Sequence, residues 1–203
     1  MKNKQQKLLI LVLGVASVLW SSCDQGPVAR PEGYLRIGLP SADYEMLALP
    51  GFPYQFQKNQ SATFTIKDSA QFWGNLYYPT LRSTVQLTYK AVGENDLEEL
   101  VRDAQQLAYK HTVKASGMRE QLFNYPEKSV SGMYYEMSGE SASTTQFYAT
   151  DSTSHFLRGV LYHYSTPKPD SLAPVTNFIR EEIIELLNSL EWAADSTAEQ
   201  TFP

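Results

Sequence analysis

Three β-prone segments separated by very short connections constrain the fold of this chain more than any other feature. They are Gly132–Ser138, Thr144–Thr150 and His155–Tyr164, and the connections contain Gly139-Glu140 and Asp151-Ser152-Thr153. Connections this short require antiparallel neighbours, because parallel strands need a crossover of about a dozen residues or more. The last segment carries apolar or aromatic residues on both faces, which predicts a central strand.

A second group of strands is expected in the first half of the chain. Thr84–Lys90 alternates between apolar and polar residues, as a half-buried strand does. Phe72–Tyr78 is aromatic and is closed by Pro79, which a continuing strand would not tolerate. The other candidates are Tyr34–Leu39, Phe52–Gln57 and Ala62–Ile66.

Two longer segments have helical periodicity. Apolar residues recur at helical spacing over Asp96–His111, and a second apolar stripe runs from Val175 to Leu190. Asp170 or Ser171 can begin the second helix, with Pro174 in its first turn. Strands, helix, strands and helix in that order predict an α+β fold, an antiparallel sheet with two main helices packed on it. The layout is similar to the Mog1/PsbP-like sandwich, a likeness of fold alone.

The N-terminus has the pattern of a secretory signal. Lys2, Lys4 and Lys7 precede the apolar run Leu8–Trp20, and no acidic residue occurs before Cys23. The run is 13 residues long, whereas a helix that spans a bilayer needs roughly 20. We therefore expect residues 1–22 to be a signal peptide and not a permanent membrane helix.

Cys23 is expected to carry a lipid. The segment Leu19-Trp20-Ser21-Ser22-Cys23 resembles a bacterial lipobox, although Trp20 is large for its position. Cys23 is the only cysteine of the chain, so no internal disulfide can form. Acyl chains on this residue would hold the protein to a membrane, since each buried CH₂ contributes about 0.8 kcal/mol. Plain secretion with a stray cysteine is the alternative.

The remainder of the chain divides into a tether, one domain and a tail. Residues 23–32 contain Gly26 and two prolines without an apolar period, which is typical of a flexible connection. Residues 33–192 carry all the periodic segments and predict a single α+β domain. Residues 193–203 are polar and unpatterned, which predicts a disordered tail.

Charge excludes a general affinity for polyanions. Removal of the signal leaves 14 Lys and Arg against 22 Asp and Glu, a net charge of −8. An acidic chain without a basic cluster has no general attraction for nucleic acid or anionic lipid heads. We therefore expect no nucleic-acid partner, and contact with the membrane only through Cys23.

We predict no catalytic residues, cofactor or metal. Ser141, Asp151 and His155 follow the order of a hydrolase triad. However, a nucleophile elbow needs Gly where Ser143 stands, and it needs a strand-to-helix turn. His155 and His163 lie eight residues apart, roughly 27 Å along a strand, so they do not share a metal.

A short motif, Asp-Ser followed by a methyl-bearing residue, occurs four times. It is similar to the acceptor of O-glycosylation in the envelope of Bacteroidetes. The alternative is a turn or helix cap, since Asp-Ser also begins such structures. The candidate acceptors are Ser69, Ser152, Ser171 and Ser196.

Longer motifs identify a family resemblance. Arg30–Tyr34, Phe72–Pro79, Ala108–Ala115, Gln146–Ser152 and Pro169–Val175 resemble the gliding-motility lipoprotein GldD family of the Bacteroidetes. The resemblance covers nearly the whole domain. It implies a lipid-anchored envelope protein, facing the periplasm, that acts with other lipoproteins of the gliding and type IX secretion machinery. It implies no reaction and no catalytic residue.

Three functions remain open. The first is a non-catalytic component or assembly factor that binds partner proteins through an exposed aromatic patch. The rings proposed for that patch are Phe52, Tyr54, Tyr77, Tyr78 and Tyr125. The second is a periplasmic module that binds a glycan or small molecule on clustered Tyr residues and Trp73 in a concave pocket. The third, an envelope hydrolase, has almost no support in the sequence.

Overall fold

The computed structural model describes residue 3 and residues 37–94, 97–110, 115–164 and 169–193. The chain divides into residues 1–35 and residues 36–203, and the fold described here belongs to the second unit. Cys23, the tether and the tail from residue 194 on lie outside the described residues, as does the expected signal peptide except for residue 3. Neither helix in the described part is long and apolar enough to cross a membrane.

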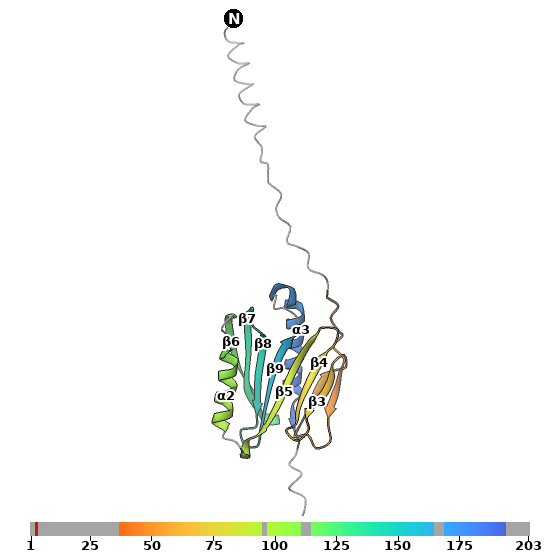
Figure 1. Ribbon diagram of the computed structural model, residues 1–203, viewed down its shortest axis with the longest axis vertical. Coiled ribbons are helices and arrows are strands. Elements are labelled where there is room, and N and C mark those ends of the chain that lie inside the picture. The colour runs from red at the N-terminus through yellow and green to blue at the C-terminus, as the bar shows by residue number, and fades with distance from the viewer. Residues whose placement is uncertain (1–2, 4–36, 95–96, 111–114, 165–168, 194–203) are drawn as a thin grey trace, which may run out of the picture. The chain divides into compact units, whose positions relative to one another are not determined.

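The described residues form two antiparallel sheets and two α-helices (Figure 1). The strands are β1 (Tyr44–Ala48), β2 (Tyr54–Asn59), β3 (Thr63–Asp68), β4 (Trp73–Tyr78), β5 (Ser83–Ala91), β6 (Ala115–Tyr125), β7 (Val130–Gly139), β8 (Ser143–Thr150), β9 (His155–His163) and β10 (Glu191–Trp192). The helices are α2 (Leu97–Lys110) and α3 (Pro169–Ser189), with the short 3-10 helices η1 (Val92–Glu94) and η3 (Pro126–Lys128). The predicted α+β class, with two helices on an antiparallel sheet, is confirmed.

The larger sheet has seven strands in the order β3-β4-β5-β9-β8-β7-β6, and the smaller one has the order β1-β2-β10. The predicted meander is β7, β8 and β9, which pair consecutively and antiparallel. β9 lies between β5 and β8, so its predicted central position is confirmed. Its residue Gly159 leaves room for the ring of Phe147, which would lie 2.1 Å from an added Cβ.

Alternation along the strands gives the large sheet two apolar faces. On one of them, here called the α3 face, Val85, Leu87 and Leu161 are fully buried in a cluster with Ile179 and Ile183 of α3. Strand β2 of the small sheet packs on α3 and contributes its rings to the same core. The α3 face is therefore covered by both a helix and a second sheet.

The opposite face, here called the α2 face, has a smaller core. Tyr135, Met137 and Phe156 cluster there with Ala104 and Ala108, the two buried residues of α2. The small side chains of these alanines let the helix approach the sheet closely. α2 packs over β8 and β9, on the side of the sheet remote from β3 and β4 (Figure 1).

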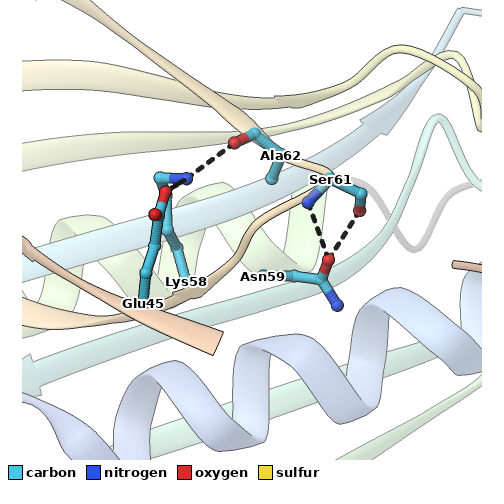
Figure 2. A network of polar contacts seen from close by, with 5 residues as sticks. All are labelled: Glu45, Lys58, Asn59, Ser61 and Ala62. Atoms are coloured by element: carbon cyan, nitrogen blue, oxygen red, sulfur yellow. Dashed lines mark hydrogen bonds and ion pairs between the residues drawn. The ribbon is translucent and has the colours of Figure 1, made fainter. Parts of the chain in front are cut away.

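A polar network closes the turn between β2 and β3 (Figure 2). Asn59 Oδ1 accepts hydrogen bonds from the N–H and the hydroxyl of Ser61, at 2.9 and 2.6 Å. Lys58 Nζ donates to the carbonyl oxygen of Ala62 at 2.9 Å and pairs with Glu45 of β1. The buried end of β2 is thus held by side chains as well as by strand pairing.

The structure corrects one predicted element and adds three strands. The segment Tyr34–Leu39 was expected as a strand, but residues 37–39 lie in no strand and the rest falls outside the described residues. Strands β1, β6 and β10 were not predicted. β6 escaped prediction because no residue of this strand is fully buried, so its sequence shows no apolar alternation.

Candidate functional site

Three of the five rings predicted to contact partners are buried in the core. Phe52, Tyr54 and Tyr78 expose 8%, 3% and 1% of their surface. Phe52 packs edge-to-face on Tyr54, and the Tyr54 hydroxyl donates to the carbonyl oxygen of Phe72 at 2.7 Å. The prediction of an exposed patch is wrong for these three rings, because all three pack into the core cluster that contains α3.

The other two rings are half-buried and lie on different strands. Tyr77 of β4 points to the α2 face and contacts Tyr164 at a ring-centroid distance of 6.0 Å. Tyr125 ends β6 and donates its hydroxyl to Asn188 Oδ1 at 2.6 Å. A single aromatic patch containing all five rings is therefore not formed, and only Tyr77 and Tyr125 remain candidates for contact with a partner.

Ser141, Asp151 and His155 each make contacts that stabilise the local fold. Asp151 Oδ1 accepts the N–H groups of Thr153, Ser154 and His155 at 2.8 to 3.0 Å. Partial burial opposes ionisation of Asp151, but these donors outweigh it and lower its pKa. The Ser141 hydroxyl donates to the carbonyl oxygen of Ser143 at 2.6 Å. The carboxylate thus organises the β8–β9 turn.

The two described histidines lie at opposite ends of β9 and have separate partners. His155 Nδ1 shares a hydrogen bond with the Tyr89 hydroxyl at 2.7 Å, and its ring stacks on Trp192 at 5.0 Å. His163 lies between the hydroxyls of Ser83 and Thr176, at 2.7 and 3.0 Å. Within the described part of the chain, no three His, Cys, Asp or Glu side chains gather closely enough to hold a metal.

Arg180 joins α3 to the end of the β7–β8 hairpin. Its guanidinium donates to Thr145 Oγ1 and to the carbonyl oxygens of Thr144 and Met137, at 3.1 to 3.3 Å. Arg180, Thr144 and Met137 border a cleft of about 240 Å³ between the helix and the hairpin. Burial lowers the pKa of His163, and the positive charge of Arg180 lowers it further. Burial and the charge of Arg180 therefore favour the neutral form of His163.

Glu182 is a buried carboxylate on the side of α3 that faces the small sheet. It is 5% exposed, and its Oε1 accepts from the Tyr44 hydroxyl at 3.1 Å and from Asn59 Nδ2 at 3.3 Å. Its Oε2 is buried with no hydrogen-bond partner among the described residues. Burial raises the pKa of Glu182, and burial together with Glu182 raises the pKa of Tyr44 to about 12. Burial therefore disfavours the ionised form of Glu182 in the folded domain.

The three described Asp-Ser motifs place their serines at the surface. Ser69, Ser152 and Ser171 are exposed, and Ser196 lies outside the described residues. Asp68 Oδ1 accepts the N–H groups of Ala70 and Gln71, so this motif also forms a turn. Exposure leaves these hydroxyls accessible to a modifying enzyme.

The most exposed large apolar side chain of the described residues lies on β6. Leu122 is 75% exposed on this outer strand, which pairs only with β7 among the described strands. Beside it, Glu120 accepts a hydrogen bond from the Tyr109 hydroxyl of α2 at 2.6 Å. Tyr109, Glu120 and Leu122 define what we call the edge surface. The β6 sequence shows no regular alternation of apolar and polar residues, so this surface was missed.

Comparison with known proteins identifies a family. A family model described as "Gliding motility lipoprotein GldD" matches residues 24–192. No curated protein matches the chain. Among solved structures, the chain is similar to the solution structure of cyanobacterial PsbP (CyanoP) from Synechocystis sp. PCC 6803. The identity is 9% and the TM-score 0.44, over 83% of this chain and 100% of that one.

Proposed function

The chain belongs to the gliding-motility lipoprotein GldD family, and on that premise we propose that it is a non-catalytic component or assembly factor of the gliding and type IX secretion machinery. Membership makes it a membrane-anchored protein of the cell envelope that takes part in gliding motility. The family match over residues 24–192 carries the proposal. Its partners would be other lipoproteins of the same machinery, and it would bind them on the periplasmic side of a membrane.

The proposed attachment point is Cys23. Its position after an apolar run and two serines is where acylation would need it, and Asp24–Glu32 would tether the domain to the lipid. The variant Cys23→Ala should move the protein from washed membranes to the soluble envelope fraction and abolish gliding on agar. Ser21→Ala is the matched control and should leave both unchanged. A Cys23→Ala protein that stays with washed membranes would refute the anchor.

The edge surface is the proposed contact with a partner lipoprotein. β6 spans 11 residues and presents the backbone groups of one edge to an added strand, the usual way in which an extended peptide joins a sheet. Leu122 provides an exposed apolar side chain beside that edge, on which a side chain of the added strand can pack. An extended segment of another gliding lipoprotein is the occupant we propose.

The contact can be tested by crosslinking in native membranes followed by capture of the protein. Leu122→Lys should reduce the yield of crosslinked partner lipoproteins by about tenfold, with little effect on folding because surface substitutions change stability by about 0.5 kcal/mol or less. Ile66→Lys is the matched control, since Ile66 is 46% exposed on β3 at the opposite edge of the sheet. Equal yields from the two variants would argue against the edge surface.

Modification of the exposed serines is a separate proposal. Ser69, Ser152 and Ser171 are accessible, and an O-linked glycan on them or on Ser196 would increase the intact mass of the native protein. The expected mass exceeds that of polypeptide plus lipid and falls when the serines are replaced by alanine. A native mass equal to lipidated polypeptide would exclude the modification.

A further inference from the structure

The α2 face of the large sheet carries an open groove over β3, β4 and β5. Its volume is about 470 Å³, and it lies where α2 does not pack. Alternation along β4 turns Asn75 and Tyr77 into this groove, while Leu76 between them is buried on the α3 face. Thr65 lies directly opposite Asn75 in the pairing of β3 with β4. The floor of the groove is therefore formed by hydroxyl and amide groups instead of an apolar core.

The groove is positively charged in a chain that is otherwise acidic. Lys67 and Arg82 both line it, and no carboxylate is among its lining residues. Within the described residues, neither side chain has a hydrogen bond or an ion pair. Two unpaired cations on one concave surface favour an anionic ligand, because the low-dielectric walls of a cleft focus their potential.

Arg82 is held over the groove at a cost in backbone energy. Its φ is 46°, in the left-handed region that a glycine would occupy without strain. A non-glycine residue there costs on the order of 1 kcal/mol. The carbonyl oxygen of Arg82 accepts the N–H of Tyr164 at 2.8 Å, and both residues line the groove. In the described structure, the guanidinium makes no hydrogen bond or ion pair that would offset the strain.

Aromatic rings lie beside these charges. Tyr164 is 52% exposed and meets Tyr77 edge-to-face, with 72° between the ring planes. Trp73 begins β4, about 13 Å along the strand from Tyr77. The ammonium of Lys90 lies 5.7 Å from the centre of the Trp73 ring, on the same face of the sheet. Rings whose faces remain accessible can stack on the apolar faces of sugars, while threonine and asparagine bind hydroxyl groups.

We propose that this groove binds an anionic saccharide, a glycan whose sugars carry carboxylate or phosphate groups. Lys67 and Arg82 bind the charged groups, Tyr77 and Tyr164 stack on the rings, and Thr65 and Asn75 hydrogen-bond the hydroxyls. A nucleic acid is the less favoured polyanion, because the net charge of −8 repels a chain that is charged at every residue. This inference extends beyond the proposed partner contact, which lies at the other edge of the sheet.

The test is titration of the lipidated full-length protein in detergent micelles with defined oligosaccharides, followed by calorimetry. Hexagalacturonate provides carboxylated sugars, and maltohexaose is the uncharged probe. Hexagalacturonate should bind at least tenfold more tightly than maltohexaose. Lys67→Gln and Arg82→Gly should each weaken binding at least tenfold, and the double variant should show none. Arg82→Gly relieves the strained φ, so its thermal unfolding temperature should rise while its binding is lost.

Matched controls separate the groove from general charge. Arg119→Gln removes one cation from exposed β6 at the opposite edge and should change the affinity less than twofold. Tyr77→Leu removes a stacking ring and should bind at least fivefold more weakly. The proposal is overturned if hexagalacturonate does not bind, if maltohexaose or an eight-residue oligothymidylate binds as tightly, or if Arg119→Gln weakens binding as much as Lys67→Gln.

Discussion

Replacing Asn59 by aspartate should make the stability of the domain steeply dependent on pH. Asn59 is 1% exposed, and its Nδ2 donates to the carbonyl oxygen of Ser41 at 2.8 Å and to Glu182 Oε1 at 3.3 Å. Asn59→Asp keeps the acceptor that holds Ser61 but places a second carboxylate oxygen where the amide nitrogen was. Two ionised carboxylates 3.3 Å apart repel by about 5 kcal/mol at an effective dielectric constant of 20.

The pair avoids this repulsion by keeping one proton, which raises its apparent pKa in the folded state. In the unfolded chain an aspartate titrates near pH 4. Between pH 4 and the raised pKa of the pair, the folded variant therefore binds about one proton more than the unfolded variant does. A raised folded pKa contributes stability that is complete below about pH 4 and is lost as the pH increases. The loss is about 1.4 kcal/mol per pH unit, or up to about 4 kcal/mol between pH 5 and pH 8.

Urea unfolding followed by tryptophan fluorescence, in a Cys23→Ala background without lipid, measures this difference. Asn59→Asp should lose about 1 to 2 kcal/mol at pH 5, from its altered hydrogen bonds, and considerably more at pH 8. The double variant Asn59→Asp with Glu182→Gln removes the repulsion and should recover most of the loss at pH 8. Asn124→Asp, on exposed β6, is the control and should be nearly neutral. Equal losses at pH 5 and pH 8, or no recovery in the double variant, would refute the reasoning.

Three further predictions concern other buried groups. Glu182→Gln alone should stabilise the domain more at pH 8 than at pH 5, measured by urea unfolding, because burial raises the pKa of Glu182 and its ionisation opposes folding. His163→Asn should reduce the destabilisation seen between pH 7 and pH 5, because the lowered pKa of His163 gives stability that is present above about 6.5 and lost below it. Gly132→Ala would place a Cβ 1.9 Å from the carbonyl oxygen of Tyr148 and should cost about 3 kcal/mol or more in thermal unfolding, while Gly93→Ala, with open space around it, should not.

Strand positions were predictable where a strand has one buried face and clear ends. Phe72–Tyr78 and Thr84–Lys90 agree with β4 and β5 within one residue, because Pro79 and regular alternation mark them. The expected Phe52–Gln57 was shifted by two residues from β2, because a turn with Gly51 at a φ of 79° precedes Pro53. Local chemistry thus determines where a strand lies when its burial pattern and its turns agree.

Exposure of individual rings was less predictable, since it depends on which layers cover each face. Tyr77 and Tyr78 are neighbours of the same type, yet Tyr78 is fully buried while Tyr77 lines the groove. Alternation in the sequence says that they point to opposite faces, but it does not say which face carries the thicker layer. Which face is covered more thickly depends on the packing of α3 against β2, two elements that lie far apart in the chain.

The open half of the α2 face follows from the dimensions of the elements. Seven strands at about 4.8 Å spacing span about 29 Å between the outermost strands, whereas a helix with its side chains is about 10 Å wide and covers roughly two strands. On the α3 face the small sheet supplies the missing cover. On the α2 face, the described residues offer only α2, which packs over β8 and β9. The strands β3 to β5 must therefore present polar side chains there, and Thr65, Asn75 and Gln86 do so. Because α2 does not cover the whole width of the sheet on this face, a surface remains on which Lys67 and Arg82 can bind a charged ligand.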